Sequence, residues 1–199
     1  MKTAVVVLAG GEGRRIEGAK PLRILGGRTL LDRALERAGR YGEEIAIAVR
    51  ERGQPGDAPA FPLLLDDPSL PGPLAGIASA LRFARERGAD SVLTAPCDAP
   101  FLPDDLLERL SPALTAGVAV ARSGGRLHPV CALWRAGLDA VLHAYAATGR
   151  GSIMGLAEAA GWTAVDWPAE PLDPFFNINT AEDLARAEQL LAPGRGVQA

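Results

Sequence analysis

The sequence predicts an α/β protein, a three-layer sandwich in which helices cover both faces of a mostly parallel sheet. Short apolar runs rich in β-branched residues alternate with segments of helical periodicity, which is the pattern of repeated βαβ units. The 23 glycines and 16 prolines among 199 residues indicate many turns, and a hydrophobic fraction of 48% is enough for a sizeable core. One stretch breaks the alternation and predicts a small antiparallel extension.

The amino-terminal half of the chain shows the alternation most clearly. Five consecutive apolar residues at positions 4–8 fit a strand that is buried on both faces. The Gly-rich residues 10–27 predict a loop, and the apolar stripe within 29–40 predicts a helix. The same reasoning predicts strands over 45–49, 61–65 and 91–95 and a helix over 74–87.

The carboxyl-terminal half departs from simple alternation. A short helix opens at Pro103, and two strands then follow each other over 117–121 and 127–134, which predicts the antiparallel extension. Helices are predicted over 138–146, 152–160 and 180–191, with an edge strand over 163–165. We interpret residues 1–192 as a single domain and residues 193–199 as a frayed tail.

Charge and cysteine content exclude some classes of function. The formal net charge of −3 argues against a nucleic-acid partner, which usually needs a basic face. No apolar run approaches the roughly 20 residues that a membrane span needs. Cys97 and Cys131 show neither a pairing pattern nor metal-ligand spacing, so we expect two reduced thiols in a cytoplasmic protein.

The first predicted strand runs into the segment LAGGEGRRIEGAK, residues 8–20. Its glycines let backbone N–H groups approach phosphate oxygens, at the end of a strand where ligands of open α/β sheets bind. Arg14, Arg15 and Lys20 add positive charge, and Lys20 is one of two lysines in the chain, the other being Lys2. The segment therefore predicts a phosphate site, and a turn with solvated charges is the alternative.

Two well-known phosphate loops do not fit this segment. In the P-loop a Lys directly follows the second glycine and a Ser or Thr follows the Lys, whereas here Ala19 precedes Lys20 and Pro21 follows it. The dinucleotide fingerprint requires a third glycine where Ile16 stands. These mismatches argue against a P-loop NTPase and against an NAD-dependent oxidoreductase.

Two further turns carry candidate ligands for a nucleotide. Asp98 directly follows the predicted strand at 91–95 in a proline-rich turn, where a carboxylate can hold Mg²⁺ against substrate phosphates. Asp66, Asp67 and Gly72 lie between a predicted strand and a predicted helix. Taken alone, that second segment is explained best as a turn and a helix start.

The segment before the last helix carries two amides. Asn177 and Asn179 alternate with Phe176 and Ile178, so in an extended chain the amides share one side and could bind a polar heterocycle. Turn-forming asparagines ahead of a helix cap explain them equally well. His128 and residues 150–152 are weaker candidates.

The order and spacing of these segments resemble the molybdenum cofactor guanylyltransferase family, within the Rossmann-like nucleotidyltransferases. The match extends over about residues 3–190, although Ile16 and Glu17 replace the family's Met-Gly. By analogy, the LAGG sequence that ends at Gly11 favours GTP, because related cytidylyltransferases typically carry LAAG. The matching residues are, for the nucleotide, Leu8, Ala9, Gly10, Gly11, Gly13, Lys20, Asp66, Gly72 and Asp98, and for the pterin, Asn177 and Asn179.

The resemblance implies transfer of GMP from GTP to the terminal phosphate of molybdenum-molybdopterin, with release of pyrophosphate. It implies that Arg15, Lys20 and Asp98 are catalytic, that Asp98 binds Mg²⁺, and that backbone N–H groups of residues 9–13 hold the triphosphate. The acceptor phosphate is itself the nucleophile, so no histidine base is expected. The family also implies transient contact with molybdoenzymes or other proteins of cofactor synthesis.

Two alternatives stay open at this point. Cytidylyl or other nucleotidyl transfer, to molybdopterin or to a sugar phosphate, would use the same loops. A nucleotide-binding protein without turnover is the other, because Glu17 brings a negative charge near the phosphates.

Overall fold

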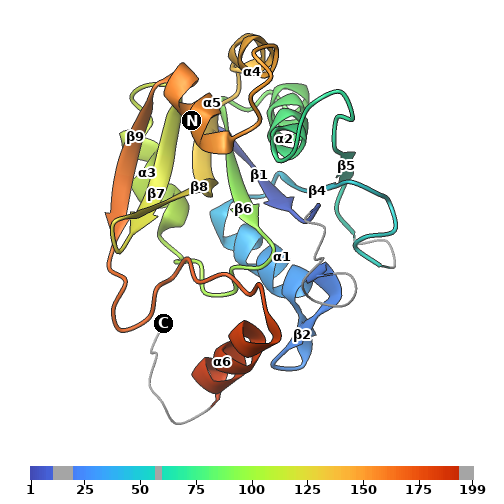
Figure 1. Ribbon diagram of the computed structural model, residues 1–199, viewed down its shortest axis with the longest axis vertical. Helices are drawn as coiled ribbons and strands as arrows, with labels where there is room; N and C mark the ends of the chain where they lie inside the picture. The colour runs from blue at the N-terminus through green and yellow to red at the C-terminus, as the bar shows by residue number, and fades with distance from the viewer. Residues whose placement is uncertain (11–19, 57–59, 193–199) are drawn as a thin grey trace.

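A mixed sheet of seven strands lies at the centre of the computed structural model, which describes residues 1–10, 20–56 and 60–192 (Figure 1). In the sheet the strand order is β5-β4-β1-β6-β8-β7-β9. The strands are β1 (Thr3–Leu8), β4 (Ile45–Val49), β5 (Leu63–Leu65), β6 (Ser91–Pro96), β7 (Val118–Ser123), β8 (Arg126–Arg135) and β9 (Trp162–Trp167). The α-helices are α1 (Leu30–Tyr41), α2 (Leu74–Glu86), α3 (Leu106–Ala113), α4 (Asp139–Ala146), α5 (Ile153–Ala160) and α6 (Ala181–Leu191).

Strand directions confirm the predicted fold class and its antiparallel extension. Neighbours among β5, β4, β1 and β6 pair in parallel, as do β7 and β9. β8 pairs antiparallel with both β6 and β7, so within the described chain it is the one strand of this sheet that runs in the opposite direction. β9 lies at an edge of the sheet, as expected.

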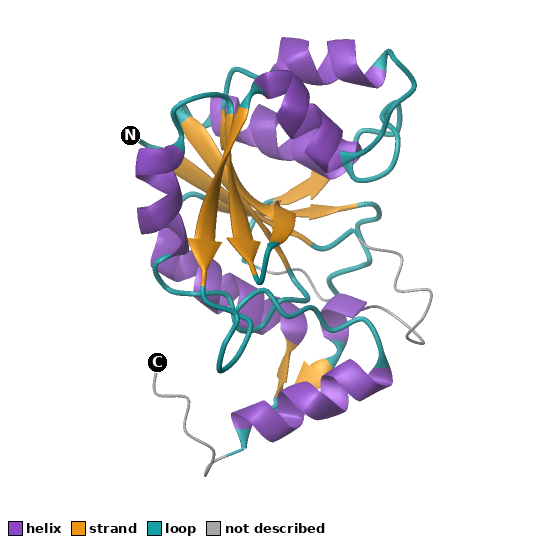
Figure 2. Ribbon diagram, turned by 60° about the vertical axis from the view of Figure 1, so that its left-hand side comes forward, coloured by secondary structure: helices purple, strands orange, loops and turns teal. Residues whose placement is uncertain are grey.

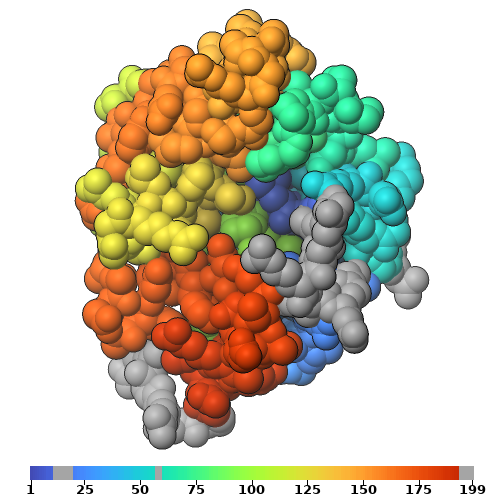
Figure 3. Space-filling view, viewed as in Figure 1, coloured from blue at the N-terminus to red at the C-terminus, as the bar shows by residue number. Residues whose placement is uncertain are grey.

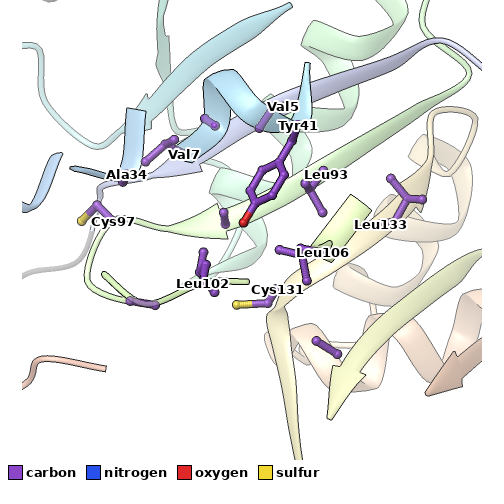
Figure 4. Packing of buried hydrophobic residues seen from close by; sticks show 14 of the residues in the cluster. Val5, Val7, Ala34, Tyr41, Leu93, Cys97, Leu102, Leu106, Cys131 and Leu133 are labelled. Atoms are coloured by element: carbon purple, nitrogen blue, oxygen red, sulfur yellow. The ribbon is translucent and has the colours of Figure 1, made fainter. Parts of the chain in front are cut away.

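Both faces of the sheet are buried under helices, which Figure 2 shows from a second side. In β1, Val5 and Val7 pack in one apolar layer with α1 and α3, whereas Ala4 and Val6 pack in another with α2, α4 and α5. Figure 4 shows the first layer from close by, with the ring of Tyr41 at its centre. This double burial is what a continuous β-branched run predicts, because successive side chains point to opposite faces.

Residues 20–29 differ from the predicted loop. Lys20–Leu22 form a 3-10 turn, η1, and β2 (Ile24–Leu25) pairs antiparallel with β3 (Arg28–Thr29). Gly26 and Gly27 have positive φ angles of 54° and 76°, as a tight two-residue hairpin turn requires. The loop prediction was wrong here because strands of two residues are too short to show periodicity.

α6 packs against this hairpin instead of the main sheet. A small apolar cluster joins them, made of Leu25, Leu30, Ile178 and Ala187. The Gly26 N–H donates to Glu188 Oε1 at 2.9 Å, and a capping box between Thr180 and Asp183 starts the helix, as the sequence indicates. α6 therefore fixes the end of the segment that precedes it, which carries the two predicted pterin-side amides.

Some element boundaries differ from the predictions. β5 begins at Leu63 instead of residue 61, and α3 begins at Leu106 because Pro103 opens a turn ahead of it. The predicted frayed tail over 193–199 lies outside the described residues. In the part of the chain that the structure describes, no helix combines the length and the apolar character of a membrane span.

Candidate active site

The carboxyl ends of three neighbouring strands meet at one edge of the sheet. Leu8, the last residue of β1, is in register with Ala48 of β4 and with Pro96 of β6. The Cys97 N–H donates to the Leu8 carbonyl at 3.1 Å, which holds the turn before Asp98 against the end of β1. The glycine-rich loop and the Asp98 turn therefore leave the sheet side by side, where ligands of open α/β sheets bind.

The molecular surface is hollowed at this edge. Figure 3 shows β1 (dark blue) and β6 (green) at the bottom of the hollow. The β7–β8 hairpin (yellow), the segment before α6 (red) and the chain around the start of α2 (teal) surround it. A ligand in the hollow would contact loops from both halves of the chain.

Lys20, Asp98 and Asn179 meet beside this edge of the sheet, although Lys20 and Asn179 are 159 positions apart in the sequence. Lys20 Nζ forms an ion pair with Asp98 Oδ2 and donates a 2.8 Å hydrogen bond to Asn179 Oδ1. The side chains of Lys20 and Asp98 are only 12% and 17% exposed, so their charges are shielded from water. One ammonium group thus links the predicted nucleotide loops to the predicted pterin segment.

The second carboxylate oxygen of Asp98 fits a divalent cation. Asp98 Oδ1 is buried and has no hydrogen-bond partner among the described residues. A buried oxygen without a partner is costly, and a cation bound there would satisfy it. No cluster of three His, Cys, Asp or Glu that could hold a metal ion occurs within the described ranges. Mg²⁺ suits such a site, because it commonly takes one or two carboxylates and completes its shell with phosphates and water.

Cys97 precedes Asp98 but has no nucleophilic character. Burial, with a further contribution from the charge of Asp98, raises the pKa of the Cys97 thiol to about 12. The thiol is therefore protonated at neutral pH, and thiolate is the reactive form. The ionic chemistry of this turn belongs to Asp98 and its partner Lys20.

Asp66 lies between Gly10, which follows β1, and Gly76, in the first turn of α2. A Cβ on Gly10 would come within 2.9 Å of Asp66 Oδ2, and a Cβ on Gly76 within 3.5 Å of Asp66 Oδ1. Asp66 Oδ1 is buried and has no hydrogen-bond partner among the described residues, and burial raises the pKa of this carboxyl. Asp67, the neighbouring alternative, instead accepts hydrogen bonds from the N–H and hydroxyl of Ser69. The structure thus places Asp66, and not Asp67, against Gly10.

Gly72 lies in the turn that leads into α2. Its φ of 56° is a conformation that favours glycine, and a Cβ there would meet open space. The turn before α5 lies against it, since a Cβ on Gly151 would come within 3.4 Å of Pro71. Residues 150–152, a weaker candidate in the sequence, therefore border the same loop.

The glycine-rich loop is described only in part. Gly11, Gly13 and Arg15 lie outside the described residues. The Ala9 N–H donates to the Ala48 carbonyl at 2.8 Å, so it continues the sheet. Sheet pairing thus extends one residue beyond β1, and the expected contact of the backbone N–H groups of residues 9–13 with a triphosphate stays a prediction.

The segment before α6 is a loop and not a strand. Phe176 and Ile178 still pack in one apolar cluster, as their alternation predicts. Asn179 is exposed and binds Lys20, whereas Asn177 is half-buried. The sequence did not point to Asp173, which belongs to a polar cluster with Ser123 and His128 next to this loop. His128, a weaker candidate in the sequence, was the signal that could have led to this cluster.

The chain matches known proteins over nearly its full length. Residues 5–165 match the family model described as the MobA-like NTP transferase domain. The molybdenum cofactor guanylyltransferase of Cereibacter sphaeroides is 43% identical over 193 residues, which cover 96% of this chain and 98% of that protein. The crystal structure of molybdopterin-guanine dinucleotide biosynthesis protein A from Archaeoglobus fulgidus has a TM-score of 0.76 at 26% identity, over 94% of this chain and 97% of that chain.

A more distant structure shares the fold alone. It is a Mycobacterium tuberculosis protein in complex with manganese, with a TM-score of 0.68 at 15% identity, over 95% of this chain and 99% of that chain. The family model spans most of the described fold, and the bacterial relative is similar from end to end. The chain therefore belongs to the molybdenum cofactor guanylyltransferase family of MobA-like NTP transferases.

Proposed function

We propose that this protein transfers GMP from GTP to the terminal phosphate of molybdenum-molybdopterin and releases pyrophosphate. The contact of Lys20 with both Asp98 and Asn179 carries the proposal, because it joins the loops that the family resemblance assigns to the two substrates. Relatives named molybdenum cofactor guanylyltransferase, at 42–43% identity, support the choice of nucleotide and acceptor.

The reaction needs positioning and charge neutralisation more than proton transfer. A terminal phosphate oxygen of the acceptor attacks the α-phosphorus of GTP. The new P–O bond forms as the bond between the α-phosphorus and the β-phosphate oxygen breaks, and pyrophosphate leaves. A phosphate monoester has a second pKa of about 6, so its attacking oxygen is already ionised near neutral pH.

Asp98 and Lys20 supply the charges that this chemistry requires. We propose that Asp98 Oδ1 would hold Mg²⁺, which would supply positive charge against the substrate phosphates. Lys20 neutralises a further phosphate charge from the opposite side of the carboxylate. Without nucleotide, the Lys20 ammonium compensates the buried charge of Asp98, which would otherwise be costly. Arg15 adds a third cation by family resemblance.

The nucleotide itself is assigned to the loops after β1 and β5. Gly72 leaves open space beside the backbone, Asp66 lies close to where a Cβ on Gly10 would be, and Leu8 lies against the Gly76 position. Asp66 offers carboxylate oxygens that accept hydrogen bonds from ribose hydroxyls or base N–H groups. Gly11 and Gly13 belong to the same assignment by resemblance, with Asn177 and Asn179 on the pterin side.

A cytoplasmic location belongs to the same proposal. Cys97 and Cys131 are both free and buried, as suits a reducing compartment. The product then passes to molybdoenzymes, or to other proteins of cofactor synthesis, by transient contact.

Calorimetric titration of the protein with GTP, CTP and ATP in Mg²⁺ tests the nucleotide. We expect GTP to bind at least about tenfold more tightly than CTP, a difference of roughly 1.4 kcal/mol. A preference for CTP would keep the fold and the chemistry but replace guanylyl by cytidylyl transfer. If none of the three nucleotides binds, the glycine-rich loop is not a nucleotide-binding site.

Turnover tests the reaction, with pyrophosphate release from GTP measured with and without molybdenum-molybdopterin. We expect release only with the acceptor, and none above background for Asp98→Ala, because the metal ion is the largest local charge in such a site. Asp139→Ala is the matched control: Asp139 pairs with Arg85 on the surface, and we expect near wild-type turnover. Magnesium-dependent turnover by Asp98→Ala would contradict the mechanism.

A further inference from the structure

A buried polar cluster lies beside the active site, and the mechanism above does not use it. Ser123 Oγ, at the end of β7, is 2.8 Å from His128 Nε2 and donates a 2.7 Å hydrogen bond to Asp173 Oδ1. Ser123 is 1% exposed and His128 9%. Asp173 comes from the loop between β9 and α6, so the cluster joins the β7–β8 hairpin to that loop.

The order of these groups determines the proton positions. A carboxylate only accepts hydrogen bonds, so the single Ser123 hydroxyl hydrogen goes to Asp173. His128 Nε2 must then carry the hydrogen that Ser123 Oγ accepts. In a hydrolytic triad the histidine lies between serine and carboxylate and accepts the serine proton. Here the serine lies between the other two, so the cluster is not a nucleophile and its base.

Pro129 explains why His128 turns inward. The pairing of β7 with β8 jumps at this point: Val120 pairs with Ala132, but Ala121 pairs with His128. Residues 129–131 therefore drop out of the β7–β8 ladder, at a proline that has no N–H to donate. Irregularities of this kind re-aim side chains, and here the His128 ring is directed into the protein.

The cluster also fixes the first residues of the active-site segment. Asp173 Oδ1 accepts a second hydrogen bond, from the Phe175 N–H at 3.0 Å. The Phe175 ring stacks on the His128 ring at a centroid distance of 4.6 Å and an interplanar angle of 16°. The Trp167 ring packs edge-on against Phe175 at a centroid distance of 5.4 Å. Phe175 is thus held by a backbone hydrogen bond and by two rings.

The same segment reaches the catalytic groups three residues later. The Ile178 N–H donates to the Asp98 carbonyl at 2.9 Å, and Asn179 accepts from Lys20. Only two residues lie between Phe175 and Ile178, so we expect a shift at Phe175 to displace Asn179 as well. A path of hydrogen bonds, continued through the backbone of residues 175–178, therefore runs from the β7–β8 hairpin to the acceptor side of the active site.

We propose that His128, Ser123 and Asp173 act as positioning residues, which hold residues 175–179 against the Asp98 turn so that Asn179 meets the acceptor. This inference rests on the proposed function, in which Asn179 faces the pterin. The cluster itself touches neither substrate. Its loss is expected to weaken the acceptor complex while leaving nucleotide binding intact.

Kinetics of single variants separate positioning from general stability. For Ser123→Ala and His128→Leu we expect the KM for molybdenum-molybdopterin to rise about tenfold, the effect of a buried group left without its partner. The GTP Kd should stay within about twofold. His128→Gln keeps an N–H donor at similar reach and should recover most of the loss. His143→Gln is the matched control, because His143 is the other histidine and is exposed on α4.

Amide hydrogen exchange tests the same inference without turnover. In Ser123→Ala we expect the Phe175 and Ile178 amides to exchange at least about tenfold faster, while Val6 in the central strand β1 stays unchanged. If the Val6 amide exchanges faster by the same factor, or if the KM for the acceptor and the Kd for GTP change in parallel, the cluster has only a structural role and the inference fails.

The two proposals fail in distinguishable ways. Wild-type protein without acceptor-dependent pyrophosphate release would overturn the proposed function, and the exchange experiment would still decide whether the cluster holds the segment. Wild-type turnover, with an unchanged acceptor KM in Ser123→Ala, would overturn the positioning role alone.

Discussion

Lys20 is the residue on which the two halves of the candidate site converge. Its compact ammonium pairs with a carboxylate and an amide at once, from loops far apart in the sequence. Apart from Lys2, every other basic residue is an arginine. A planar guanidinium presents its donors in a fixed fork and does not reproduce the contacts of a point charge.

Replacement of Lys20 should therefore impair catalysis strongly. We expect Lys20→Ala to lower kcat/KM by about 100-fold or more, as is typical when a charge contact of the transition state is lost, and Lys20→Arg to restore little. Steady-state pyrophosphate release measures the effect. Lys2→Ala is the control, because Lys2 binds the Arg87 carbonyl at the other end of β1. A loss of tenfold or less would reduce Lys20 to a structural role.

His128 predicts a pH dependence of stability. Burial lowers its pKa from the ordinary 6.5, against the opposing charge of Asp173 and with a further lowering by Arg126. The unfolded chain therefore takes up the proton at higher pH than the folded one, so stability is lost as pH falls below about 6.5. Between about pH 7.5 and 5.5, the unfolding temperature should fall less for His128→Gln than for wild type. An equal fall in both would contradict this, and His143→Gln should match wild type.

At the scale of elements, two glycines within helices differ in how closely the neighbouring helix packs against them. In α5, a Cβ on Gly155 would overlap the Tyr145 hydroxyl of α4 and come within 2.8 Å of Ser152 Oγ. In α1, a Cβ on Gly39 would meet nothing within 4 Å. Gly155 allows α4 and α5 to approach each other closely. Gly39 lowers the stability of α1 although no neighbouring atom requires a glycine there.

The same substitution should thus have opposite effects at these two positions. We expect Gly39→Ala to stabilise the protein by about 0.5–1 kcal/mol and Gly155→Ala to destabilise it by about 1–3 kcal/mol through overpacking. Urea unfolding of both variants measures the free energies. Equal effects would show that the packing of α4 on α5 does not constrain Gly155.

At the scale of the whole molecule, the site depends on contacts between distant segments. The Asp98 turn is bound to the end of β1, to η1 through Lys20, and to the loop before α6 through Ile178. α6 in turn is fastened to the β2–β3 hairpin. A ligand in the hollow would bind only the folded arrangement of these segments, and it should stabilise them together.

Ligand and metal removal test this coupling. With Mg²⁺ and GTP at about 100 times its Kd, the free energy of unfolding should rise by about 2.7 kcal/mol. Chelation of Mg²⁺ should remove most of that gain, and Asp98→Ala should show little gain with or without Mg²⁺. Denaturant unfolding monitors the change, with Asp67→Ala as a control that keeps the full gain. An undiminished gain in Asp98→Ala would contradict the assigned metal ligand.

Local pattern was sufficient for much of the fold. The α/β sandwich follows from the apolar run at residues 4–8 and from the helical stripes, and the antiparallel extension follows from the two successive strands after residue 117. These patterns are readable because a segment that is buried on two faces, on one face or on none has a different apolar periodicity in each case. The segment 20–29 escaped prediction, since its strands are too short for a period. Asp98 was predictable as a candidate because a polar residue after an apolar strand lies at the ligand edge of such a sheet.

The sequence by itself determined the layers of this protein, the loops that carry its polar residues and the family to which it belongs. The tertiary structure alone decided which oxygen of Asp98 lacks a partner, that Asp66 and not Asp67 faces Gly10, and that Lys20 meets Asn179. It alone joined His128 to Asp173. The physical reason is that periodicity and turn chemistry act between near neighbours in the chain, whereas these contacts arise when β8 inserts between β6 and β7 and α6 folds back onto the β2–β3 hairpin.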